Sequence, residues 1–179
     1  MNNRRYIIHL ITEIAILSAL SIILSIIDKY ISGYIFINIP NAKIGLANLI
    51  ILVSLQHHKF YETFIITLLK SLIAGLLFSG LIAFMVGGTA TIASFLFMYF
   101  AYKLLKDKVS IVGISLLGGF IHTVTQLLVI SLLYNIGYVV ISYAFALILI
   151  SLVASTLIGI LSIKLNNVYF DINFRRNVF

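Results

Sequence analysis

A single lysine inside an apolar run is the residue whose position most needs a chemical explanation. Lys70 lies near the middle of the hydrophobic stretch 61–78, where a charged side chain costs about 2.5–3.5 kcal/mol on insertion scales. At helical spacing it shares one face with Thr63, Thr67 and Ser71, which indicates that it points into a bundle. We expect an anionic ligand to supply its counter-charge. A lysine that extends to the interface, or that pairs with a structural carboxylate, is the alternative.

A polar pair at helical spacing follows further along the chain. His122 and Gln126 are four residues apart, and Gly118 and Gly119 precede them by about one turn. Both side chains therefore project from one face, beside a place where another helix can approach closely. They are candidates for hydrogen bonds to a bound solute, and hydrogen bonds between helices are the alternative. One His without a nearby carboxylate supplies too few ligands for a metal, so neither a metal nor a cofactor is expected.

The segment 40–48 combines a cation, a glycine and an amide at the start of an apolar helix. Lys43, Gly45 and Asn48 follow Pro40, the only proline in the chain. A helix N-terminus presents free N–H groups and the positive end of the helix dipole, and both attract anions. Lys43 and Asn48 are therefore candidate ligand contacts. A purely structural start of a helix explains the same residues.

These side chains require a scaffold that is itself embedded in lipid. The hydrophobic fraction is 62%, the charged fraction is 9% and the mean hydropathy is +1.18, whereas ordinary soluble domains are about 45–50% apolar and about 25% charged. A soluble fold of 179 residues cannot hide so much apolar surface. We therefore predict one integral membrane domain, an all-α polytopic bundle of about six transmembrane helices. The predicted helices are 9–27, 44–56, 61–78, 81–105, 109–133 and 138–165.

The basic residues predict the orientation of this bundle. Six crossings put both termini on one side, and that side collects Arg4, Arg5, Lys59, Lys103, Lys106, Lys108, Lys164, Arg175 and Arg176. Lys29 and Lys43 fall on the other side. The positive-inside rule then places both termini in the cytoplasm of a multi-pass cell-membrane protein, and no nucleic-acid partner is expected. This partition holds only if 44–56, although short for a full span, crosses the membrane.

Several catalytic chemistries lack their residues in this chain. It has no cysteine and no Gly-x-x-x-x-Gly-Lys-Ser/Thr motif for nucleotide phosphates. Its five acidic residues are scattered, and none forms a pair suited to magnesium and diphosphate chemistry or to glycoside hydrolysis. The sequence therefore predicts a protein that is not an enzyme.

Several of these features together resemble the Gx transporter family, which is also labelled heptaprenyl diphosphate synthase component I. The similarity rests on 40–48, Lys70, Gly87-Gly88, the run Gly118-Gly119-Phe120-Ile121-His122, and Gln126. It extends from the first predicted helix to the last, and its most specific piece is 40–48. The family is in turn similar to the S components of energy-coupling-factor importers, small helical membrane proteins that bind vitamins or related micronutrients.

This resemblance implies a substrate-binding subunit for a small vitamin-like or anionic micronutrient. The implied contacts are Lys43 and Asn48 at the mouth of the site, Lys70 for charge, and His122 and Gln126 for hydrogen bonds. The loop 28–43 would act as a lid. Lys70 stands where the family often has arginine, and a lysine cannot form the bidentate pair that arginine makes with carboxylate or phosphate.

Small residues recur every four positions on two of the predicted helices. Ser151, Ser155 and Gly159 are typical of close helix packing within a chain. Ala15 and Ala19 match the Ala-x-x-x-Ala stripe that, in S components, docks a transmembrane coupling subunit bearing two ABC ATPases. The resemblance implies the same partners here, in addition to membrane lipid.

Two other functions fit less of the sequence. The runner-up is a non-catalytic membrane accessory in isoprenoid (heptaprenyl diphosphate), quinone or extracytoplasmic electron-transfer metabolism. Prenyl diphosphate synthases themselves grip their substrate through aspartate-rich magnesium motifs, and none of the Asp residues here adjoins another. A standalone secondary carrier would normally show an internal repeat and a coupling-ion carboxylate in the membrane, for which Glu13 is the candidate.

Overall fold

The computed structural model describes residues 3–35, 44–105, 108–134 and 137–178, and these ranges are almost entirely helical. The elements are α1 (Asn3–Ile35), α2 (Asn48–His57), α3 (Phe60–Leu72), the π-helical segment η1 (Ile73–Leu77), α4 (Phe78–Leu105), α5 (Ile111–Tyr134) and α6 (Gly137–Val178). No strand occurs in the ranges described. The all-α class predicted from the sequence is therefore confirmed.

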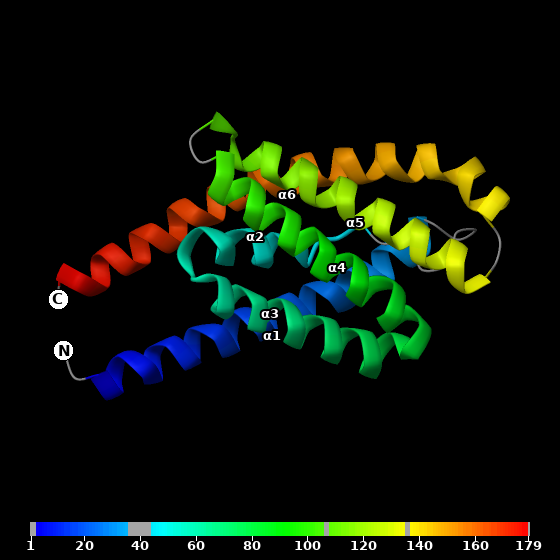
Figure 1. Cartoon of the computed structure of the whole chain (residues 1–179). Coiled ribbons are helices and arrows are strands. Elements are labelled where there is room, and N and C mark those ends of the chain that lie inside the picture. The colour runs from blue at the N-terminus through cyan, green and yellow to red at the C-terminus, as the bar shows by residue number, and fades with distance from the viewer. Residues whose placement is uncertain (1–2, 36–43, 106–107, 135–136, 179) are drawn as a thin grey trace.

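The helices form one bundle with two distinct ends (Figure 1). The first turn of α1 and the last turn of α6 lie at one end, together with the turn from α2 to α3 and the junction of α4 with α5. We call this the terminal end. The opposite, distal end holds the last turn of α1, the reversal of the chain at Gly80 near the start of α4, where the backbone is not helical, and the last turn of α5.

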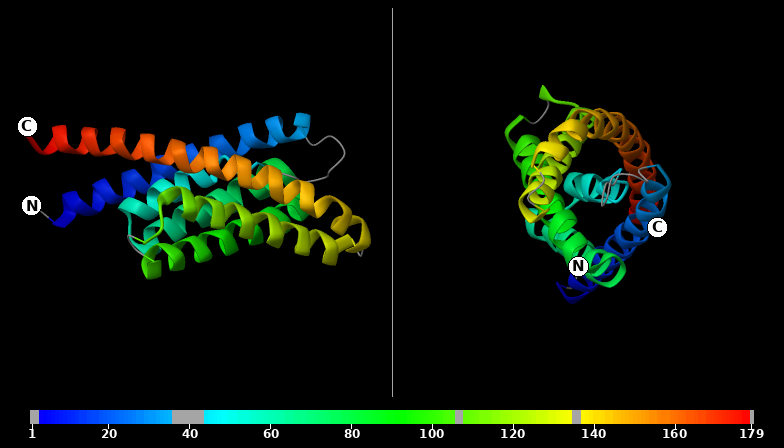
Figure 2. Two further views of the ribbon diagram at one scale, coloured as in Figure 1. Left: turned by 90° about the horizontal axis from the view of Figure 1, so that it is seen from above. Right: turned by 90° about the vertical axis from the view of Figure 1, so that its right-hand side faces the viewer.

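The short helix α2 lies inside the bundle, and the longer helices surround it (Figure 2). Seven of its ten residues are buried, namely Asn48, Ile50, Ile51, Leu52, Val53, Ser54 and Leu55. Its sequence is apolar on every side, and such a helix is stable only where all its faces are covered. Ile51 and Leu52 form the main apolar cluster with Phe95 and Met98 of α4 and Ile114 of α5.

The prediction of six full crossings is wrong in its count. Within the described ranges, four helices are long and apolar enough to span a membrane, namely Ile7–Tyr34, Gly80–Leu105, Ile111–Tyr134 and Tyr143–Asn167. α2 has 10 residues and thus rises only about 15 Å, half of the ~30 Å hydrocarbon core. α3 has 13 residues before π-helical geometry begins. α2 therefore fills the interior of a membrane helix bundle, whereas α3 packs on it with an exposed face that includes Ile65 and Leu68.

Helix α1 is longer than the predicted 9–27 and absorbs the first part of the predicted loop 28–43. Asp28 and Ser32 continue its buried face, at 3% and 1% exposure. The Ser32 hydroxyl donates a hydrogen bond to Asp28 Oδ1 at 3.0 Å, so both polar groups are satisfied without ending the helix. Helix α6 likewise runs past residue 165 to Val178.

Glycine and serine allow α4, α5 and α6 to pack at close range. Ser94 of α4 donates to the Gly118 carbonyl at 2.8 Å, and Ser151 of α6 donates to the Gly119 carbonyl at 3.0 Å. A Cβ at Gly119 would collide with the side chain of Ser155. The predicted role of the α6 small residues in packing within the chain is confirmed.

Gly159 provides a test of this packing. A Cβ at Gly159 would lie 2.8 Å from Cα of Val112 and 3.1 Å from Cβ of Ser115, so Gly159→Ala must push α5 and α6 apart. We expect a loss of about 1–3 kcal/mol, seen as a lower midpoint of thermal unfolding in detergent. Gly33→Ala is the matched control, because no atom lies within 4 Å of a Cβ placed there. Equal midpoints for the two variants would contradict the packing described.

Candidate substrate-binding site

Lys70 lies in the last turn of α3 and points into the bundle. Its side chain is 6% exposed. The ammonium group donates to Oδ1 of Asn48 at 3.3 Å and to Oγ1 of Thr91 at 3.4 Å. These oxygens belong to α2 and α4, so three helices converge on the buried charge. Because α2 starts within the bundle, its first residue can meet the ammonium group at this position.

A π-helical segment begins three residues after Lys70. In η1 the backbone leaves α-helical geometry over Ile73–Leu77, and Ala74 and Gly75 of this segment face α4 across a small cavity. Segments of this kind occur frequently at functional sites. Gly75 is required for the approach, because a Cβ there would lie 2.8 Å from the ring of Phe84.

The cavity beside Lys70 is small and only partly enclosed. Its volume is about 30 Å³, which holds one or two water molecules. The described residues that line it are Ser25, Asp28, Gly45, Lys70, Ser71, Ala74, Gly75, Ala83, Gly87, Gly88, Thr91 and His122. In this conformation the site is therefore closed around a polar interior and has no room for a vitamin-sized solute.

Asp28 is, with Thr91, a residue of this site that sequence reasoning missed. Its carboxylate accepts the backbone N–H of Ile44 at 3.1 Å and that of Gly45 at 2.8 Å, so it ties the start of the α2 segment to α1. Gly45 adopts a φ of 92°, which glycine tolerates without strain. The available signal was the helical spacing of Ser21, Ser25, Asp28 and Ser32, all of which are buried.

The three other candidate binding residues have different positions. His122 of α5 is 6% exposed and lines the cavity with Lys70. Gln126 is equally buried on α5 but is not among the described lining residues. Lys43 lies outside the described residues. The structure therefore brings together Lys70, Asn48 and His122 of the five side chains chosen from the sequence.

The sequence predicts an anionic ligand as the main counter-charge for Lys70, whereas the cavity itself already contains a carboxylate. Among the described lining residues there is one acid, Asp28, and it shares the cavity with Lys70. Much of its hydrogen-bonding capacity is already used by Ser32, Ile44 and Gly45. The cavity thus contains the ammonium group of Lys70 and the carboxylate of Asp28, and this carboxylate binds the segment that precedes α2.

Comparison with known proteins gives one result that covers most of the chain. A family model described as heptaprenyl diphosphate synthase component I matches residues 17–165. No curated protein sequence and no solved structure matches the chain. The matched region runs from α1 through most of α6 and includes every described residue of the Lys70 cavity. The chain therefore belongs to the heptaprenyl diphosphate synthase component I family.

Proposed function

We propose that this membrane protein is the substrate-binding subunit of an energy-coupling-factor type importer for a small vitamin-like or anionic micronutrient. The observation that carries the proposal is the positioned cation of Lys70, held by Asn48 and Thr91 beside a small cavity. An anionic group that enters this cavity meets an ammonium group whose geometry is already set. Because Lys70 is buried, a charge-assisted hydrogen bond to it is stronger than one at the protein surface.

Binding of a vitamin-sized solute requires the cavity to open. Pockets for such ligands usually measure about 300–1,000 Å³, against about 30 Å³ here. The contacts that close the site are those from Asp28 to the N–H groups of Ile44 and Gly45. Their release would free the start of α2 from α1, and the cavity would widen beside Lys70.

The partners belong to the same proposal. Ala15 and Ala19 are exposed on α1, whereas Ser18 and Ser21 face the interior. The alanines thus offer a flat, small-residue surface to another membrane protein, here the transmembrane coupling subunit with its two ABC ATPases. The terminal end carries Lys59 and Lys103, which supports an orientation with both termini in the cytoplasm.

A non-catalytic membrane accessory in isoprenoid or quinone metabolism is the second candidate. The observation in its favour is the description of the matching family model, heptaprenyl diphosphate synthase component I. The two functions differ in their partners. Affinity purification of the full chain from its native membrane would recover coupling-factor ATPases for the importer and a soluble prenyl-transferring subunit for the accessory.

Lys70→Met tests the proposed site. The protein would be purified in a mild detergent, and the small molecule that co-purifies would be identified and quantified by mass spectrometry. We expect at least a tenfold loss of occupancy in Lys70→Met, because a hydrogen bond to a charged group contributes about 1.5–3 kcal/mol. Lys29→Met is the control, since it removes an exposed lysine of α1. Unchanged occupancy in Lys70→Met would remove this residue from the site.

Asp28→Asn tests the closure of the cavity. The amide keeps the size of the carboxylate but loses the negative charge that attracts two backbone N–H groups. We expect faster hydrogen exchange at Ile44 and Gly45, with a stability loss of about 1–3 kcal/mol. Ser32→Ala removes the hydrogen bond from Ser32 to Asp28 and the one that Ser32 accepts from the Ile44 N–H, but it leaves the bond from the Gly45 N–H to Asp28 in place, so exchange at Gly45 should change less than in Asp28→Asn. If both variants exchange at the wild-type rate, Asp28 does not hold the site closed.

A further inference from the structure

A second and much larger hollow lies at the terminal end of the bundle. Its volume is about 800 Å³, within the usual range of about 300–1,000 Å³ for small-molecule sites. It is bounded by the turn from α2 to α3, the last turns of α4 and the start of α5. Among the described residues it shares none with the Lys70 cavity.

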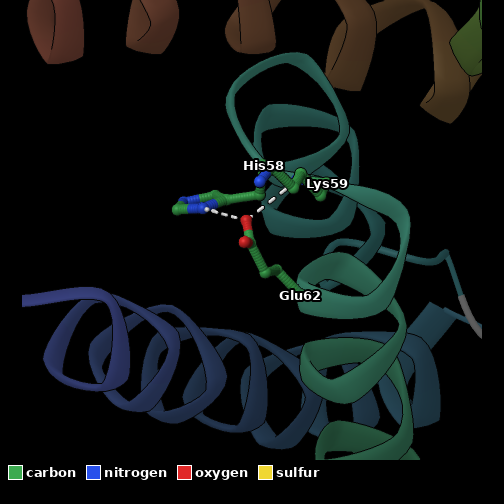
Figure 3. A network of polar contacts seen from close by, with 3 residues as sticks. All are labelled: His58, Lys59 and Glu62. Atoms are coloured by element: carbon green, nitrogen blue, oxygen red, sulfur yellow. Dashed lines mark hydrogen bonds and ion pairs between the residues drawn. The ribbon is translucent and has the colours of Figure 1, made fainter. Parts of the chain in front are cut away.

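The side chains around this hollow are basic. Lys59 and Lys103 line it together with His57 and His58, and no acid is among its described lining residues. The nearby Glu62 is not among them, but its carboxylate points toward His58 and Lys59 (Figure 3). Its carboxylate contacts Nδ1 of His58 at 3.3 Å and accepts the backbone N–H of Lys59 at 2.9 Å. The two lysines therefore give the described lining a net positive charge, which Glu62 offsets in part through its contacts with His58 and Lys59.

Two helices add to this positive charge. α3 begins at Phe60 and α5 begins at Ile111, and both of these residues line the hollow. Ser110 starts α5 by accepting the backbone N–H of Gly113 through its hydroxyl at 3.2 Å. The N-terminal end of a helix carries a partial positive charge of about half an electron unit and favours bound anions. Glu62 already caps the start of α3, so the larger contribution comes from the start of α5.

The remaining wall is aromatic and apolar. The rings of Phe60 and Tyr99 meet edge to face with centroids 4.8 Å apart. The ammonium group of Lys103 lies 6.0 Å from the centroid of the Tyr99 ring. Tyr102 and Leu55 extend this surface. The hollow thus combines a cationic rim with an apolar wall, which suits a molecule that has both an anionic group and a hydrophobic chain.

The depth of the hollow favours an occupant from the lipid bilayer. Tyr99, Tyr102 and Lys103 occupy the last turns of the apolar span Gly80–Leu105. Tyrosine and lysine at the end of a span lie at the level of the lipid headgroups. Leu104, next to them, is 77% exposed and suited to contact with acyl chains. A phosphate group held at this depth is most directly supplied by a lipid.

We infer that this hollow is a binding site for an anionic phospholipid. The phosphate of the headgroup lies between Lys59 and Lys103, facing the starts of α3 and α5. The first part of the apolar chain lies along Phe60 and Tyr99. Lipid in the leaflet at the terminal end thereby joins the α2–α3 turn to α4 and α5.

The test uses the full chain purified in an uncharged detergent and three probes. These are dihexanoyl phosphatidylglycerol, dihexanoyl phosphatidylcholine and inorganic pyrophosphate, with binding measured by titration calorimetry at low salt. Phosphatidylglycerol should bind at least tenfold more tightly than the other two. The double variant Lys59→Gln with Lys103→Gln should weaken this binding at least tenfold, whereas Lys29→Gln with Lys164→Gln, which removes the same charge elsewhere, should leave it within twofold of wild type.

Each part of this experiment has a result that would overturn the proposed phospholipid site. Equal binding of phosphatidylcholine would show that the positive rim does not select the ligand. Equal binding of pyrophosphate would assign the site to a soluble anion instead of a lipid. Equal weakening in the two double variants would show a response to net charge alone. Should the Lys59 and Lys103 double variant unfold, Lys103→Arg, which keeps the charge, and Lys103→Gln, which removes it, give the same comparison at one residue.

Discussion

An ammonium group inside an apolar bundle has to be surrounded by oxygen atoms, and the arrangement of this protein follows from that requirement. Lys70 meets Asn48 of α2 and Thr91 of α4. A full-length α2 would place its N-terminus at the distal end, beyond the last turn of α3 that carries Lys70. The short α2 instead begins within the bundle, so its first residue reaches the charge. Asp28 then satisfies the backbone N–H groups of Ile44 and Gly45 that precede this buried start.

The sequence predicts those parts of this arrangement that follow from amino-acid composition and from the helical spacing of polar and apolar residues. Its hydropathy indicates a membrane helix bundle, and the polar face of 61–78 indicates that Lys70 points inward. The number of spans does not follow from hydropathy, because α2 is as apolar as a lipid-facing helix although protein covers it. Its length of 10 residues is the feature that distinguishes a buried core helix from a crossing.

The role of Asp28 could not be predicted from local sequence for a related reason. The pair Asp28-Lys29 after an apolar run has the usual pattern of a helix end at the interface. Lys29 is indeed exposed, but Asp28 lies on the buried side of α1. Its partners, Ile44 and Gly45, follow a segment that carries no periodic signal. Only the tertiary contact between α1 and the start of α2 shows that the carboxylate has a structural role.

The two polar regions of the bundle differ in how they can discriminate among ligands. Lys70 and Asp28 are buried beside a small cavity, so solvent screens their charges little and the cavity walls restrict the shape of a ligand. The terminal hollow is larger and more open, with its lysines exposed to solvent. Its attraction for anions must therefore weaken as salt rises, since the Debye length falls to about 8 Å at physiological ionic strength. Shape and hydrogen bonding thus govern the Lys70 cavity, whereas charge and contact with a lipid chain govern the terminal hollow.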